Sequence, residues 1–199
     1  VFTDLGLKAC TIKINNRKVL AGISEVMGAA DKLIDFTVAL DKLDKIGKEK
    51  VQEEMLSKGI DQQAINLLDP VFSLSGSYSE KIARMKEMLK NSEIGLKGIE
   101  ELEFINTSMT QMPLKSAVLD LDITLARGLN YYTGCIFEVA APEGVAMGSV
   151  GGGGRYDDLT GIFGLKDVSG VGISFGLDRI YLVLEQLNLF PDSVRAGVE

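Results

Sequence analysis

The stretch "AVLDLDITLARGLNYYTGCIFEVA", residues 117–140, carries the pattern that predicts the fold class. Between residues 119 and 125, Leu and Ile alternate with Asp and Thr, which is typical of a strand with one buried face. "GCIFEVA" (134–140) has the apolar and aromatic composition of a second strand. We therefore expect two strands joined by a turn, with Arg127 and two adjacent tyrosines at the turn.

The segments on either side extend this sheet. "ACTIKI" (9–14) alternates in the same way, and helical spacing of apolar residues follows it as far as Gly28. "SGVGISF" (169–175) predicts a further strand that leads into a helix over about 176–189. These segments predict an α+β domain with an antiparallel sheet.

Residues 31–110 have a different character, being rich in Lys, Glu, Asp, Met and Leu with apolar residues three or four positions apart. This spacing predicts several short helices that form an inserted helical unit with a small core of its own. We divide the chain into a core segment (1–30), a helical insertion (31–112) and a second core segment (113–199).

Composition excludes several function classes. The chain has no histidine and two cysteines, so it lacks the residues for an imidazole base or a zinc site. The net charge of −7 disfavours a broad nucleic-acid surface. No apolar run is long enough to span a bilayer, and we expect a cytoplasmic protein that is not bound to membranes.

The run "GSVGGGGRYDDL" (148–159) contains four consecutive glycines, each of which costs roughly 0.5–1 kcal/mol of backbone entropy relative to alanine. One interpretation is a flexible hairpin loop. Because Arg155 and Tyr156 follow at once, we favour a loop that a ligand approaches closely. It is not a phosphate-binding P-loop, because an arginine stands where that loop needs a lysine and a hydroxyl.

In "GVGISFGLDR" (170–179), Gly170 and Gly172 fall within the predicted strand, where missing side chains would let a planar ligand lie against the backbone. Arg179 would follow in the first turn of the next helix. It is either a solvated arginine paired with Asp178 or a guanidinium held over a nucleotide.

Arg127 is ambiguous in the same way. It could pair with Asp120 or Glu138 at the end of a strand, or it could bind an anion. Taken alone, the sequence favours the ion pair, whereas the neighbouring tyrosines and the two other arginines beside glycines favour the anion site.

"RGLNYYTG", "GGRYDDL" and "GVGISFGLDR", in this order, resemble signatures of the histidyl-tRNA synthetase family of class II aminoacyl-tRNA synthetases. The first two resemble the histidine-specific signatures, and the third resembles the third class II motif. "LGLKACTIKINNRKVLAGI" (5–23) is similar to the strand and helix that follow the second motif. The family carries a helical insertion where residues 31–110 lie.

The resemblance implies a dimeric enzyme that activates histidine with ATP and Mg²⁺ and transfers it to tRNA(His). It implies that Arg127 is catalytic and binds the α-phosphate. The implied histidine-binding residues are Tyr131, Tyr132, Gly152, Gly153 and Tyr156. The implied ATP-binding residues are Arg127, Gly170, Gly172 and Arg179. The insertion would approach the tRNA acceptor stem, and no metal ligand is assigned within this chain.

The chain departs from the family pattern in two respects. Asn130 stands where the family usually has aspartate, and the first two class II motifs and the anticodon-binding domain are absent. We therefore expect a piece of a longer protein that is inactive alone, with the Mg²⁺ ligands outside it. The alternative is a non-catalytic module on the same fold, serving as a regulatory subunit or a protein-interaction surface.

Overall fold

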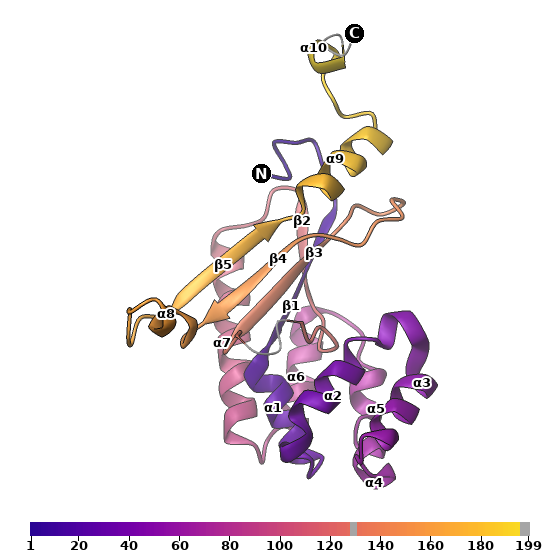
Figure 1. Ribbon diagram of the computed structural model, residues 1–199, viewed down its shortest axis with the longest axis vertical. Coiled ribbons are helices and arrows are strands. Elements are labelled where there is room, and N and C mark those ends of the chain that lie inside the picture. Colours follow the sequence, from indigo (N-terminus) through magenta and orange to yellow (C-terminus); the bar gives the residue numbers. More distant parts are fainter. Residues whose placement is uncertain (128–130, 196–199) are drawn as a thin grey trace.

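The computed structural model describes residues 1–127 and 131–195, in which a five-stranded sheet forms the centre (Figure 1). The strands are β1 (Cys10–Asn16), β2 (Ala117–Leu121), β3 (Cys135–Ala140), β4 (Ser149–Tyr156) and β5 (Gly170–Phe175). They lie in the order β2-β1-β3-β4-β5. β1 and β2 are parallel and the other neighbours are antiparallel, so the α+β class is confirmed, although the sheet is mixed.

Helices gather at both ends of this sheet. They are α1 (Arg17–Val26), α2 (Leu33–Leu40), α3 (Leu43–Ser57), α4 (Gln62–Asn66), α5 (Asp69–Phe72), α6 (Tyr78–Met88), α7 (Glu93–Gln111), α8 (Leu159–Ile162), α9 (Leu177–Gln186) and α10 (Asp192–Arg195), with a 3₁₀ turn, η1, at Ala30–Lys32. Figure 1 shows α1 to α6 at one end, α7 running behind the sheet, and α9 and α10 at the other end. None of the helices in the described part of the chain is long and apolar enough to cross a membrane.

The strand predicted over residues 119–125 ends earlier, at Leu121. The Asp122 carboxylate accepts hydrogen bonds from the Thr124 backbone N–H (3.0 Å) and hydroxyl (2.6 Å), which turns the chain. Leu125 is still buried, so the alternation continues past the end of the ladder. Asp122 therefore ends the strand, although its position in the sequence fits the alternating strand pattern.

The glycine run predicted as a loop is instead strand β4, between β3 and β5. A Cβ atom on Gly153 would lie 2.1 Å from the Gly172 carbonyl oxygen, and one on Gly154 would lie 2.7 Å from the Tyr132 ring. Glycine is therefore required by the close approach of neighbouring strand and ring atoms, and not by chain flexibility.

The helical region does not have a separate core, contrary to the sequence-based expectation. One continuous buried cluster joins Phe36 and Met55 of the helical region to Ile23 of α1 and Leu121 of β2. The helices therefore pack directly onto the sheet. The boundaries at residues 31 and 112 stay a prediction.

The crossing of α1 and α7 depends on small residues. A Cβ atom on Gly22 would lie 2.4 Å from the Gly95 Cα, and one on Gly98 would lie 2.7 Å from the Val19 backbone nitrogen. The two backbones are therefore in contact, and this contact packs α7 against α1, the helix that follows β1.

We expect Gly22→Ala to lower the free energy of unfolding by about 1–3 kcal/mol, because the added methyl group forces the helices apart. Thermal and urea unfolding would measure the change. Gly161→Ala is the matched control, since a Cβ at this helical glycine meets nothing within 4 Å. An equal effect in both variants would contradict a specific role for the crossing.

An ion pair stabilises the turn after β2. Lys13 Nζ lies 2.8 Å from Asp122 Oδ2 and 3.4 Å from Asp44 Oδ2. Burial pushes the pKa of Asp122 upward, but the bonds from Lys13 and Thr124 outweigh burial and lower this pKa. A carboxyl whose pKa is lowered on folding stabilises the fold above its ordinary pKa, and the stabilisation is lost as the pH falls through the folded-state pKa.

Asp122→Asn should therefore cost about 1–2 kcal/mol of stability at pH 7, because the amide keeps the turn but not the charge. The difference from the unsubstituted chain should shrink as the pH falls below 3.8, the ordinary pKa of this carboxyl. Unfolding curves at pH 7 and pH 3 would measure it. Glu87→Gln, which breaks the exposed pair with Lys90, should change little at either pH. A pH-independent effect of Asp122→Asn would contradict the account.

Candidate active site

One face of the sheet carries a pocket of about 290 Å³, close to the lower end of the range for ligand sites. Cross-strand pairing places Glu138, Gly152 and Ser174 next to one another on this face. The pocket is lined by Leu125, Arg127, Tyr131, Tyr132, Ile136, Phe137, Glu138, Ser149, Gly151, Gly152, Gly153, Ser174, Gly176 and Arg179. Most predicted site residues therefore meet around a glycine floor.

The segment that leads to Arg127 is held by residues at the junction of β1 and α1. Asn15, which is fully buried, donates from Nδ2 to the carbonyl oxygens of Ile123 and Leu125, each at 2.9 Å. Arg17 Nη1 donates to the Ala126 carbonyl oxygen at 3.4 Å. These bonds fix the backbone up to the residue before Arg127.

Arg127 lines the pocket and its side chain is 49% exposed. Its Nη1 is 2.8 Å from Glu138 Oε2, and its Nε is 3.9 Å from Asp41 Oδ1. Asp120 instead pairs with Lys81 at 2.6 Å. A guanidinium carries five N–H donors, so these two contacts do not use all of them. The ion pair expected with Glu138 is present and leaves donors for an anion.

The two tyrosines form one aromatic unit at the pocket wall. The rings of Tyr131 and Tyr132 are 4.4 Å apart, and Tyr132 covers Gly154. Burial, together with the hydrogen bond to the Tyr131 hydroxyl, raises the pKa of Tyr132 to about 12. Tyr132 therefore keeps its proton near neutral pH and can either donate or accept a hydrogen bond.

Arg179, in the first turn of α9, also lines the pocket. Its Nη1 donates to the Ser149 carbonyl oxygen at 2.7 Å, a backbone contact that differs from the pairing with Asp178 considered as one alternative. The side chain is exposed, so Arg179 is positioned by one bond while the guanidinium remains open to solvent.

Tyr156, Gly170 and Gly172 are not gathered into this pocket, although they lie on the same face of the sheet. A Cβ atom on Gly170 would lie 2.2 Å from the Tyr156 ring, and one on Gly172 would lie 3.1 Å from it. The ring of Tyr156 thus covers the strand surface that we expected a planar ligand to occupy. The roles assigned to these three residues stay predictions.

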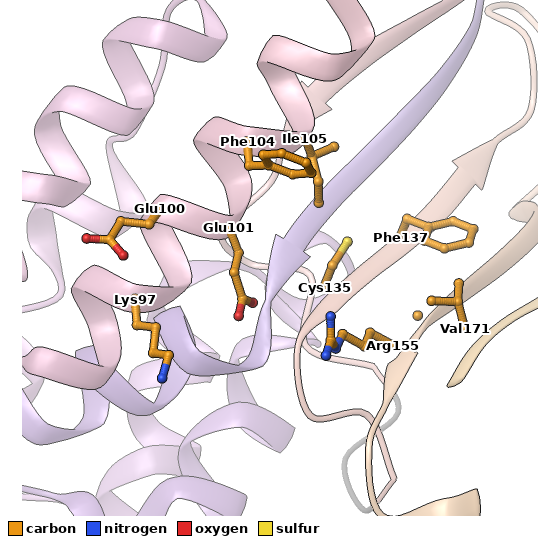
Figure 2. A pocket seen from close by; sticks show the side chains of 10 residues that line it. Lys97, Glu100, Glu101, Phe104, Ile105, Cys135, Phe137, Arg155 and Val171 are labelled. Atoms are coloured by element: carbon orange, nitrogen blue, oxygen red, sulfur yellow. The ribbon is translucent and has the colours of Figure 1, made fainter. Parts of the chain in front are cut away.

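A larger pocket, about 500 Å³, lies on the opposite face between α7 and the sheet (Figure 2). Figure 2 shows side chains of α7, including Phe104 and Ile105, opposite Phe137 and Val171 of the strands. Arg155 points to this side, where its Nε lies 3.0 Å from Asp157 Oδ1. It therefore lies apart from the other arginines of the predicted site.

Several residues that line the pocket containing Arg127, which we call the front pocket, were not predicted from the sequence. Glu138 was considered only as an ion-pair partner, and Ser149 and Ser174 carried no distinctive spacing. Over residues 1–127 and 131–195, no three His, Cys, Asp or Glu side chains form a cluster that could hold a metal ion. Asn130, at which the chain departs from the family pattern, lies outside the described residues.

Comparisons with known proteins show which family the chain resembles. The family model for histidyl-tRNA synthetase matches residues 1–180. The histidine–tRNA ligase of Christiangramia forsetii is 69% identical over 194 residues, which are 98% of this chain and 42% of that protein. The chain thus spans less than half the length of this curated relative.

Solved structures share the architecture. A histidyl-tRNA synthetase from Nostoc sp. PCC 7120 superposes with a TM-score of 0.85 at 31% identity, covering 96% of this chain and 45% of that one. A Bacillus halodurans protein described as an ATP phosphoribosyltransferase regulatory subunit/histidyl-tRNA synthetase has a TM-score of 0.68 at 21% identity, over 90% of this chain and 45% of that one, which shows a shared fold alone. With the family model matching most of its length, the chain belongs to the histidyl-tRNA synthetase family.

Proposed function

We propose that the protein containing this chain is a histidine–tRNA ligase. In its first step the carboxylate of histidine attacks the α-phosphorus of ATP, forming histidyl-adenylate and releasing pyrophosphate. In its second step a terminal hydroxyl of tRNA(His) attacks the acyl carbon, and AMP leaves. The observation that carries the proposal is the pocket that brings Arg127, Tyr132 and Arg179 together over a glycine floor.

The two arginines suit the anionic parts of these reactants. Charge grows on the α-phosphate oxygens as the carboxylate attacks, and a donor already in place at that position lowers the barrier. Arg127 contacts Glu138 and still has N–H donors that are not used, so it is assigned this role. Arg179, which lines the same pocket, is assigned to the rest of ATP, because a guanidinium can stack on adenine or bond phosphate.

Tyr132 suits the imidazole of histidine. Its raised pKa keeps the phenol neutral, so it can exchange a hydrogen bond with either ring nitrogen. Tyr131 supports its ring, and Gly152 and Gly153 provide a floor without side chains. Part of the histidine site is assigned to the longer protein, since the chain spans 42% of its curated relative.

The resemblance to the family implies that ATP binds together with Mg²⁺. The carboxylates of the described residues do not form a cluster suited to a metal ion, so these residues alone do not fit it. We derive no step through the metal and assign its protein ligands outside this chain.

The rival function is a non-catalytic regulatory module, of which the Bacillus halodurans relative gives one description. A regulatory module needs the fold but not the reactive side chains. Arg127, Tyr132 and Arg179 meet in one pocket, and this favours the enzyme. Contact between the helical region and the tRNA acceptor stem, and a homodimer of the longer protein, complete the proposal.

We expect Arg127→Ala in the full-length protein to lower kcat for histidine-dependent ATP–pyrophosphate exchange roughly 100- to 1,000-fold, as loss of one aligned donor does elsewhere. Exchange of radiolabelled pyrophosphate into ATP measures this step. Arg84→Ala, an exposed arginine on α6, is the control and should exchange normally. Absence of exchange in the unsubstituted protein would reject the enzyme, while full exchange by Arg127→Ala would reject only the role of Arg127.

The tRNA contact can be tested at exposed lysines of the helical region. Lys45 and Lys50 are exposed on α3, whereas Lys48 is paired with Asp69 at 2.8 Å. Replacing Lys45 and Lys50 by alanine should weaken tRNA binding and reduce its salt slope by about one per lysine. Pyrophosphate exchange should not change.

Lys8→Ala, which changes an exposed lysine in the segment before β1, is the control. Filter binding over a salt series and aminoacylation rates give both readouts. If tRNA affinity and salt slope matched the unsubstituted protein, the helical region would not contact tRNA through α3.

A further inference from the structure

Glu138 is the most deeply placed charged group of the front pocket. It lies in the middle of the central strand β3, opposite Lys13 on one side and Gly152 on the other. Its side chain is 13% exposed, and its Oε2 atom is buried. A carboxylate at such a position is costly unless a charge partner compensates it.

The partner nearest to Glu138 is Arg127. The Nη1–Oε2 distance is 2.8 Å, but the alignment falls short of a hydrogen bond, so Oε2 has no hydrogen-bond partner among the described residues. The second carboxylate at Arg127, from Asp41, is more distant at 3.9 Å. Glu138 is therefore the carboxylate closest to Arg127, and its Oε2 atom can still accept a hydrogen bond from the guanidinium.

We propose that Glu138 is a positioning residue, which holds the guanidinium of Arg127 over the pocket so that its remaining donors face the reacting phosphate. The inference rests on the proposed function. A bound guanidinium loses fewer orientations when the ligand arrives, and misplacing a catalytic group by about 1 Å can cost roughly 100-fold in rate. Glu138 itself touches no reacting atom in this scheme.

Burial and the neighbouring charges together disfavour the charged form of Glu138. Burial raises its pKa, with Asp41 and Asp122 acting in the same direction and Arg127 and Lys13 opposing them. Asp44 faces Lys13 from α3. A carboxyl whose pKa is raised on folding destabilises the folded state at pH values above its ordinary pKa, and this cost grows until the pH exceeds the raised pKa of the folded state. Replacing Glu138 with glutamine should therefore leave the melting temperature at neutral pH unchanged or higher.

The test compares Glu138→Gln, Arg127→Ala and the double variant in the full-length protein by histidine-dependent ATP–pyrophosphate exchange. We expect Glu138→Gln to lower kcat roughly 10- to 100-fold while changing KM for ATP and histidine little. In the Arg127→Ala background the same change should have no further effect, because a residue that acts through Arg127 has nothing left to position.

The matched control is Asp120→Asn, which removes a similarly short carboxylate–cation contact, with Lys81, outside the pocket. Its exchange rate should equal that of the unsubstituted protein. Normal kcat in Glu138→Gln, or a further loss when it is added to Arg127→Ala, would overturn the inference while the proposed function stands. Absence of exchange in the unsubstituted protein would instead overturn the proposed function.

Discussion

The close packing around strand β4 is the constraint on which the site depends. The space that a side chain would need at Gly153 is taken by the Gly172 carbonyl oxygen, and the space at Gly154 is taken by the Tyr132 ring and the Cys135 carbonyl oxygen. Because β4 carries no side chains here, its neighbours approach closely and a ring can lie flat on the backbone. Gly151, Gly152 and Gly153 thus line the pocket, and Gly154 leaves the space that the Tyr132 ring occupies.

A second set of contacts supplies the charges around this floor. Asn15 and Arg17 hold the backbone before Arg127, and Lys13 holds the turn that brings it there. Asp41, at the end of α2, approaches Arg127 from the helical region, which shares a continuous core with the sheet. The helical region therefore contributes a charged side chain to the surroundings of the pocket and packs against the sheet that carries it.

The local sequence pattern predicted β1, β3 and β5 and the existence of β2, through alternation for β1 and β2 and through apolar and aromatic composition for β3. It could not predict β4, because a run of glycines has no periodicity and its meaning depends on neighbours distant in sequence. It also could not predict that β2 ends at Leu121, since Asp122 fits the strand pattern and acts by capping Thr124. Cross-strand and long-range contacts determine both features.

The site was predictable to a similar extent. Arg127, Tyr132 and Arg179 belong to glycine-containing motifs that resemble a family, and all three line the same pocket. Glu138 was one polar residue in an alternating strand, and only its distance to Arg127 gives it a role. The cover that Tyr156 forms over Gly170 and Gly172 depends on strand register, which composition does not encode.

The most direct test of the account is a crystal structure of the full-length protein with an unreactive sulfamoyl analogue of histidyl-adenylate. The account predicts the analogue on the glycine floor, with its imidazole bonded to the Tyr132 hydroxyl and its sulfamoyl group at Arg127. An analogue bound on the α7 side of the sheet, or one that contacts neither residue, would contradict it.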